Sequence, residues 1–475
     1  MLSAGILFPP AAAMAQDGPA FEEFEEFVDP VDEVGAPPAS TAADFEADPY
    51  PVSDAVAARD EALFADPAAP GAPPELRPTS VVVAPIRSVS RPVPPSSSAA
   101  LPVTGTIPLL VDREADDRAA YEPAGLRLGS FQIDASLTSG LGVSSEDGAH
   151  LYTAGELRLT SDWDRHALGL TLQGSTERPF DGGLKDPVGS ALLDGRLDIT
   201  DVDRLGGTIG YTFYREDDDS VEVEASGRRS DVHTLSTSLG YERKAGLVGL
   251  DLKGALDRTI FTADSDRDEF LLSGSMRLTL DSGATLRPFV EAGVVARLPD
   301  AERDEDGYAR RGLGGELKGG LAVDTDFVSG EVAVGYARER LDDDRLEDIH
   351  AVIGEGELIY SPTPLAAFSL RGSTTIEPSA IAGATGSVTH AVDLGFSYAI
   401  RPNIVFDAGA GLSYEDYTGF DRSVLTTRVT AGVSWRLNRT VELSLSAGHE
   451  VTDERGPGAV DNRDTRVLAA VTLRR

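Results

Sequence analysis

Apolar and polar residues alternate one by one over long stretches of the chain between about residue 125 and the last residue. In residues 425–437 the odd positions are mostly apolar, from Leu425 to Leu437, and the even positions are polar or small. Residues 441–448 repeat the pattern after a short turn. Because successive side chains of a β-strand point to opposite faces, these segments predict strands with one apolar and one polar face.

The same alternation predicts about eighteen strands, and an even number lets an antiparallel sheet close with both ends of the chain on one side. The predicted strands cover residues 130–144, 150–163, 166–176, 188–200, 206–215, 232–244, 247–261, 269–281, 284–298, 312–325, 330–340, 349–361, 365–377, 388–400, 404–416, 422–437, 440–451 and 465–474.

The connections between these strands alternate between short and long. The short joins hold residues that tight turns favour: Ala245-Gly246, Ser282-Gly283, Ser329-Gly330, Pro362-Thr363-Pro364, Arg401-Pro402-Asn403 and Asn438-Arg439. The long joins are acidic, among them Glu216-Asp217-Asp218-Asp219, Asp264-Ser265-Asp266-Arg267-Asp268, Asp304-Glu305-Asp306, Asp342-Asp343-Asp344 and Thr452-Asp453-Glu454-Arg455. Two chemically different ends are typical of an array that crosses a membrane, with short turns in the periplasm and long loops outside. The predicted fold class is therefore all-β, an antiparallel transmembrane β-barrel.

Aromatic residues near the ends of the predicted strands fit the belts that form where a barrel meets the lipid headgroups. The candidates are Tyr211, Tyr336, Tyr360, Phe368, Tyr398, Phe406, Tyr414 and Trp435. Ordinary β-propensity is the alternative explanation for any one of them.

Composition narrows the class of protein. No apolar stretch approaches the length of a membrane-spanning helix, which excludes a helical membrane protein. The chain has no cysteine, so it has no disulfide and no thiolate metal site. Its net charge of −37 makes nucleic acid an improbable partner, because phosphate binding needs clustered cations.

The first 124 residues do not follow the alternation. Residues 1–15 resemble a clipped signal peptide, because an apolar core precedes the small-x-small pattern Ala13-Met14-Ala15. Residues 16–124 are rich in Pro, Ala, Asp and Glu and cannot bury enough apolar surface to offset their ordering entropy. They predict a disordered periplasmic extension, either a solvated spacer or a tether to peptidoglycan or a partner.

Three features prompt a family resemblance: the segment Gly125-Leu126-Arg127-Leu128-Gly129-Ser130-Phe131, the glycine-studded strands, and the turn Arg401-Pro402-Asn403 after an aromatic strand. Residues 125–475 resemble the barrels grouped as putative β-barrel porin type 2, which occur in the outer membrane of Gram-negative bacteria. The resemblance implies a barrel of unassigned substrate. Barrels of this class usually end in an aromatic residue that the barrel-insertion machinery reads, whereas this chain ends Leu473-Arg474-Arg475.

Nothing in the sequence suggests an enzyme, a cofactor or a dedicated metal site. Catalytic carboxylates need perturbed pKa values in a dry cleft, whereas acidic loops in water titrate normally. The six histidines show no metal-binding or triad spacing. Gly312-Leu313-Gly314-Gly315 lies within a predicted strand and precedes no helix, so it is not a phosphate loop.

The polar face of the strands carries charges of both signs. Barrels of sixteen to eighteen strands leave an aqueous interior where such charges stay hydrated. This predicts a porin-like passive diffusion channel for small hydrophilic solutes with mild cation preference, and a lumen packed shut by side chains and loops is the alternative. The predicted lumen-facing charges are Asp134, Glu156, Arg158, Asp194, Arg196, Asp198, Asp251, Lys253, Arg277, Arg287, Glu291, Arg297, Glu316, Lys318, Arg371, Asp393, Asp407, Arg428, Arg436 and Glu442.

The long join at 215–231 is the third external loop, the loop that folds inward to narrow the pore in general porins. Acidic and basic groups opposed across such a constriction sort solutes by charge. The candidates are Asp217, Asp218, Asp219, Arg228 and Arg229. A solvated surface loop is the alternative.

Two other functions stay open: a non-conducting structural or adhesin-like barrel whose loops or periplasmic arm bind partners, and a component of polysaccharide export. The expected location is the bacterial outer membrane. The expected partners are outer-membrane lipid, lipopolysaccharide and the insertion machinery, with divalent cations at the acidic outer loops because hard oxygen ligands suit hard cations. The sequence does not decide whether the barrel is an oligomer.

Overall fold

The computed structural model of the chain describes residues 121–475, apart from 147, 181, 183–184, 217–222, 224–226, 380 and 458. The predicted signal peptide and nearly all of the predicted extension lie outside the described residues. In the part that the structure describes, no helix is long and apolar enough to cross a membrane.

The described part consists mainly of strands, with one short 3₁₀ helix, η1, at Ser265–Arg267. The strands are β1 (Leu126–Leu128), β2 (Phe131–Ser144), β3 (Gly148–Ser161), β4 (His166–Pro179), β5 (Lys185–Asp198), β6 (Asp203–Arg215), β7 (Asp231–Ala245), β8 (Val248–Phe261), β9 (Glu269–Leu280), β10 (Leu286–Pro299), β11 (Gly312–Asp324), β12 (Val328–Leu341), β13 (Ile349–Thr363), β14 (Ala366–Pro378), β15 (Gly386–Arg401), β16 (Ile404–Thr418), β17 (Ser423–Arg436), β18 (Val441–Arg455) and β19 (Asn462–Arg474).

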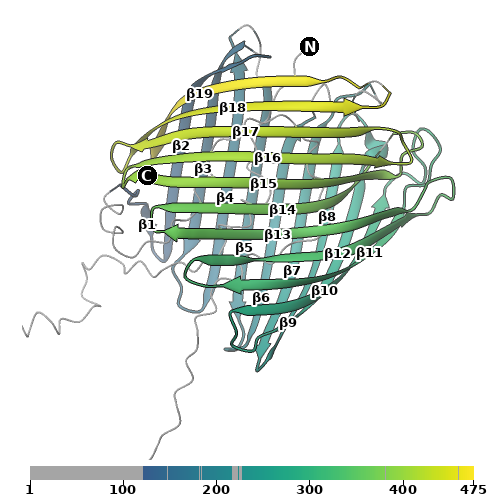
Figure 1. Ribbon diagram of the computed structural model, residues 1–475, viewed down its shortest axis with the longest axis horizontal. Coiled ribbons are helices and arrows are strands. Elements are labelled where there is room, and N and C mark those ends of the chain that lie inside the picture. Colours follow the sequence, from purple (N-terminus) through teal and green to yellow (C-terminus); the bar gives the residue numbers. More distant parts are fainter. Residues whose placement is uncertain are drawn as a thin grey trace, which may run out of the picture. The chain divides into compact units, whose positions relative to one another are not determined.

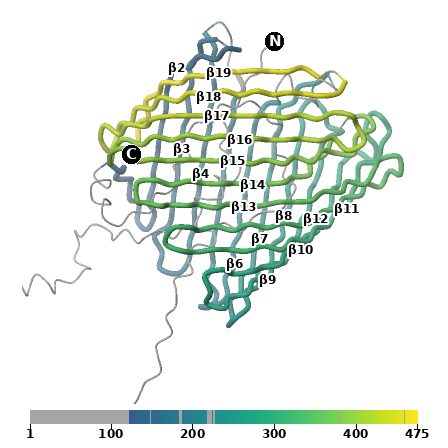
Figure 2. Tube along the Cα trace, in the orientation of Figure 1, coloured from purple at the N-terminus to yellow at the C-terminus, as the bar shows by residue number. Residues whose placement is uncertain are grey.

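The strands β2 to β19 form one closed antiparallel sheet. Each pairs with the next along the chain, and β19 pairs with β2, with Leu473 opposite Leu137. Figure 1 shows β13 to β19 side by side on the nearer wall, crossing the strands of the far wall at a steep angle. The Cα trace in Figure 2 follows the same order around the barrel. The predicted all-β barrel of eighteen strands is confirmed.

The segment before the barrel differs from the prediction of a simple entry into the first strand. Residues Leu126–Leu128 form the separate strand β1, which folds back on β2 and places Leu128 opposite Phe131. The turn between them contains Gly129 with φ of +62°, a backbone conformation that favours glycine. The predicted strand start at residue 130 is therefore preceded by one extra, short hairpin strand.

Burial in the barrel is the reverse of that in a soluble protein. Apolar side chains on one face are exposed, for example Leu317 at 59%, Val429 at 55% and Leu445 at 56%. The opposite face buries charge, with Glu291 at 4% and Lys318 at 2% exposure. A continuous exposed apolar surface of this extent is stable only against lipid, so the outer face belongs to the membrane.

Short turns close one end of the barrel, which we call the turn end, and the longer connections lie at the other, the loop end. The predicted turn at Ser329-Gly330 is wrong, because both residues lie in β12 and pair with Asp324 and Val323. The actual turn is Thr325-Asp326-Phe327, and the hydroxyl of Thr325 accepts a hydrogen bond from the backbone N–H of Val328 at 2.9 Å. Alternation alone does not reveal a side chain that closes a turn in this way.

The wall has one interruption, which we call the seam. Pairing between β13 and β14 stops at Gly356 opposite Gly372, although β13 continues along β12 and β14 continues along β15 toward the loop end. Ile376 and Leu370 lie on the same face of β14, the face that points outward at Leu370. Ile376 is nevertheless buried, in a cluster with Ile349 and Ile353 from the inner face of β13. The ends of β14 and β15 therefore lie on the lumen side of β13.

The inside-outside assignment predicts how charge is tolerated on β18. Leu445→Arg places a cation in lipid near the middle of the strand and should destabilise the folded barrel by roughly 2–4 kcal/mol, whereas Ser444→Arg points to the lumen and should cost much less. Denaturant titration in lipid vesicles measures both values. Equal destabilisation by the two substitutions would contradict the assignment.

The seam predicts a local difference in amide exchange. The backbone N–H of Gly354 points toward β14, where it donates to the Thr374 hydroxyl at 3.1 Å. Alternate amides of a strand point to the same side, so the amides of His350 and Val352 also point toward β14, where no backbone pairing with that strand remains. They should exchange with deuterium faster than the amides of Leu358 and Tyr360, which lie in the paired half of β13. Uniform protection along β13 would contradict the interruption.

Candidate functional site

The inner wall carries a dense group of ion pairs on β9 to β13, which we call the wall cluster. Arg277 of β9 donates to Glu291 at 2.8 Å and, across two intervening strands, to Glu331 of β12 at 3.0 Å. Its guanidinium lies 3.9 Å from the centre of the Phe289 ring, which holds it flat against the wall. Arg277 is thereby fixed on three sides.

Lys318 of β11 is the second cation of the wall cluster. Its Nζ lies 2.7 Å from Glu355, 3.2 Å from Glu291 and 3.6 Å from Glu316. Since Glu291 also contacts Arg277, the two cations share one carboxylate, and the five strands β9 to β13 are joined through a single network. Buried charges in such a network are tolerated because each has opposite charge in hydrogen-bonding reach.

A third cation, Arg297, extends the wall cluster toward the loop end. It donates to Glu339 of β12 at 2.9 Å and to Glu269 of β9 at 3.2 Å. The complete wall cluster therefore has three cations, Arg277, Arg297 and Lys318, and six carboxylates, Glu269, Glu291, Glu316, Glu331, Glu339 and Glu355. The carboxylates outnumber the cations, so this part of the wall is net negative.

Eight more of the predicted lumen charges are held in ion pairs along the wall, namely Glu156, Arg158, Arg196, Asp198, Arg371, Arg428, Arg436 and Glu442. The pairs are Arg158 with Glu156 at 3.2 Å, Arg196 with Asp198 at 3.5 Å, Arg371 with Glu357 at 2.7 Å, Arg428 with Glu450 at 2.6 Å and Arg436 with Glu442 at 3.4 Å. Sequence reasoning missed several partners, namely Glu269, Glu331, Glu339, Glu355, Glu357 and Glu450. Their positions have the parity of the polar face, so the alternation contained the signal.

The predicted constriction falls partly outside the described residues, which do not include Asp217, Asp218 and Asp219. Arg228 lies among neighbouring loops, 2.8 Å from Glu305 and 3.8 Å from Asp264. Arg229 donates to the backbone carbonyl of Glu216 at 2.5 Å. These contacts tie the loop to its neighbours, and the opposition of acid and base across a pore stays a prediction.

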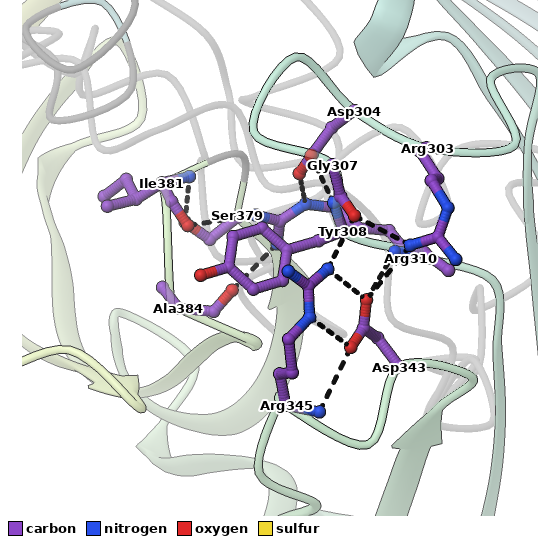
Figure 3. Close-up of polar contacts among 11 residues, drawn as sticks. Arg303, Asp304, Gly307, Tyr308, Arg310, Asp343, Arg345, Ser379, Ile381 and Ala384 are labelled. Atoms are coloured by element: carbon purple, nitrogen blue, oxygen red, sulfur yellow. Dashed lines mark hydrogen bonds and ion pairs between the residues drawn. The ribbon is translucent and has the colours of Figure 1, made fainter.

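Three connections at the loop end are locked together, as Figure 3 shows. Arg310, in the connection after β10, donates to Asp304 at 2.6 Å and to the carbonyls of Ile381 and Ala384, which follow β14, at 3.0 and 2.8 Å. We call the whole group the loop cluster: Arg303, Asp304, Gly307, Tyr308, Arg310, Asp343, Arg345, Ile381 and Ala384.

Arg345 and Asp343, in the connection after β12, complete the loop cluster. The Asp343 carboxylate accepts from Arg345 at 2.8 and 2.7 Å and from the backbone N–H of Ala309 at 3.0 Å. Arg345 also lies 4.2 Å from the centre of the Tyr308 ring. Acidic loops that the sequence predicts as solvated are therefore braced by arginine.

The acidic loops show no preformed cation site in the described residues, where no group of three or more His, Asp or Glu side chains could hold a metal ion. Asp304 and Asp343 are instead engaged by Arg310 and Arg345. Divalent cations at the outer loops stay a prediction.

Residues 118–475 match the family described as putative beta-barrel porin 2. The chain belongs to this family. It is an outer-membrane β-barrel, and the family match begins seven residues before the predicted barrel start at 125. No curated protein matches the sequence.

Solved structures similar to this porin-family barrel include three bacterial proteins. They are the FrpB iron transporter of Neisseria meningitidis (11% identity, TM-score 0.40, 72% of this chain and 64% of that chain), the outer membrane transporter YddB of Escherichia coli (8%, 0.38, 69% and 61%) and the siderophore receptor PirA of Pseudomonas aeruginosa (8%, 0.38, 74% and 81%). The chain spans less than two thirds of the length of the FrpB and YddB chains.

The loop cluster predicts a response to acid. Hydrogen bonds from the Arg345 side chain and from the backbone N–H of Ala309 hold the pKa of the Asp343 carboxyl well below its usual range. A lowered pKa in the folded state means that this stabilisation is complete above the ordinary value of about 4 and is lost as the pH falls through the lower, folded value. The loop cluster should therefore be intact at pH 5 and loosen only in stronger acid.

A spin label can follow this transition, because the chain has no cysteine and Asp306→Cys places a single one in an exposed part of the loop. The label should be immobile at pH 5 and become mobile in strong acid. In the Asp343→Asn background it should be mobile at both. The same pH profile in both proteins would show that Asp343 does not hold the loops.

Proposed function

We propose that this barrel is a passive diffusion channel for small hydrophilic solutes with mild preference for cations. The observation that carries the proposal is the wall cluster, in which six carboxylates face the lumen against three cations. A charged, net negative lining lowers the cost of entry for a hydrated cation and raises it for an anion.

The direction of the ion pairs supports an open lumen. The ion pairs described for the inner wall join strands that are close in the sheet, such as Arg277 on β9 and Glu331 on β12. Side chains paired in this way lie along the wall and leave the centre of a wide barrel to water. A plug of interlocked side chains would instead need pairs between opposite walls.

The proposed orientation has the turn end in the periplasm and the loop end outside. The barrel strands at the two ends of the sheet, β2 and β19, begin and end at the turn end, so in this orientation the closing pair of strands opens toward the periplasm. Long external loops and short periplasmic turns are the usual arrangement of bacterial barrels.

The loop cluster favours a second candidate, a non-conducting barrel whose outer loops bind a partner. Arg310 and Arg345 join three connections into one braced unit, and such a unit suits a fixed recognition surface better than freely moving loops would. The two candidates differ in whether ions cross.

Planar-bilayer recording of the purified protein tests the first candidate. We expect discrete current steps and a reversal potential under a salt gradient that shows cation selectivity. Glu331→Gln together with Glu355→Gln should move this potential toward zero, because two lumen carboxylates are neutralised.

Asp453→Asn is the matched control. The Asp453 side chain is exposed on the outer face of β18, so removal of its charge should leave the ion selectivity unchanged. Persistent silence of correctly folded protein would reject the channel and favour the second candidate. An equal effect of Asp453→Asn would show that the wall cluster does not set selectivity.

A further inference from the structure

Four of the six histidines lie at the same level of the barrel. The four are His233 on β7, His350 on β13, His390 on β15 and His449 on β18, and each is among the outward-facing residues of its strand. On each strand the histidine lies nearer the loop end than the exposed apolar residues of the same face. We call these four the histidine belt. The other two differ, because His150 is buried 3.9 Å from Glu177 and His166 begins β4 at the turn end.

Each ring of the histidine belt is held by a hydroxyl on the neighbouring strand. The Nδ1 atoms lie 2.8 Å from Tyr211 for His233, 2.8 Å from Tyr336 for His350, 2.9 Å from Thr374 for His390 and 2.8 Å from Thr465 for His449. A hydroxyl that donates to Nδ1 leaves the ring proton on Nε2. The repeated contact fixes the orientation of the four rings, and in the tautomer in which the hydroxyl is the donor each Nε2–H is free to donate on the outward face.

The histidine belt lies where the apolar band ends. On β13, Tyr360 near the turn end and His350 are ten residues apart on the outward face, and on β15 Ile400 and His390 are also ten apart. A rise of about 3.3 Å per residue on a strand tilted by about 45° converts this spacing to roughly 23 Å, close to the height of the lipid-facing band of a barrel. The belt is thus at headgroup depth.

Arginines add positive charge beside His350. Arg338 is opposite His350 in the register of β12 and β13, where it pairs with Asp348. Arg340 lies on the same outward face and its side chain is 64% exposed; its neighbouring carboxylates are Asp344, at 3.5 Å, and Asp348. Immediately toward the membrane, Val352 and Val392 are exposed next to His350 and His390. Cationic donors therefore adjoin an apolar surface.

We propose that the histidine belt binds the phosphate groups of the phosphorylated glycolipid of the outer leaflet, lipopolysaccharide. The Nε2–H groups and the Arg340 guanidinium donate to phosphate oxygens, while the valines below them contact the acyl chains. Charge complementarity and depth both fit this occupant, since a phosphate at headgroup level is an anion attached to an apolar body. This binding does not depend on whether the barrel conducts ions.

Tyr336 is a positioning residue in this arrangement. Its hydroxyl contacts the ring of His350, and its own ring lies 6.2 Å from the imidazole in a stacked orientation. Tyr336→Phe keeps the ring and removes the hydroxyl, so it should weaken lipid binding without disturbing the apolar surface.

Native mass spectrometry of the full-length protein in detergent tests the proposal. The probes are bis-phosphorylated lipid A, the same lipid after removal of both phosphates, and phosphatidylglycerol. Wild-type protein should retain bis-phosphorylated lipid A in preference to both other lipids. His350→Gln combined with Arg340→Gln should weaken this binding about tenfold or more, as expected when hydrogen bonds to a charged group are lost. Tyr336→Phe should cause a smaller loss.

His166→Gln is the matched control, because Nδ1 of His166 accepts a hydrogen bond from the Asp198 backbone N–H at the opposite end of the barrel. It should bind lipid A as wild type does. Equal retention of the dephosphorylated lipid would overturn the proposal, as would equal retention of phosphatidylglycerol or an equal loss in His166→Gln. Unchanged binding in the double variant, with its folding verified by heat-modifiable gel mobility, would also overturn it.

Discussion

The constraint on which the whole structure depends is that lipid offers no partner to a backbone N–H or carbonyl. A sheet can satisfy its backbone in hydrocarbon only if it has no edge, and the pairing of β19 with β2 removes the edge. Closure then separates two surfaces, and the alternation of side chains gives each surface its own solvent. The apolar outer face and the charged inner wall both follow from that one closure.

Closure also explains how so many charges can be buried in a thin wall. Arg277 and Lys318 would be costly in hydrocarbon, but inside the barrel they are buried among carboxylates of neighbouring strands. Because Glu291 contacts both cations, removal of one member leaves the others incompletely paired. The wall cluster is therefore both a lining of the lumen and a brace across β9 to β13.

The strands could be predicted from the sequence because the two solvents impose a strict period of two on residues such as those around Leu445. The inner-wall parity likewise identifies Glu331 and Glu355 once the strands are placed. Other features depend on contacts between distant segments. The Ser329-Gly330 turn was misplaced because Thr325 closes the real one, and the loop cluster depends on Arg310 reaching carbonyls after β14, a contact that no local pattern encodes.

The seam has a consequence for the shape of the barrel wall. The circumference of a barrel is set by the number of strands that share its wall. Where the ends of β14 and β15 lie behind β13, fewer strands make up the perimeter than at the level of Gly356 and Gly372. The wall is therefore two layers deep at the loop end of the seam, and its inner face is narrowed there by the ends of β14 and β15.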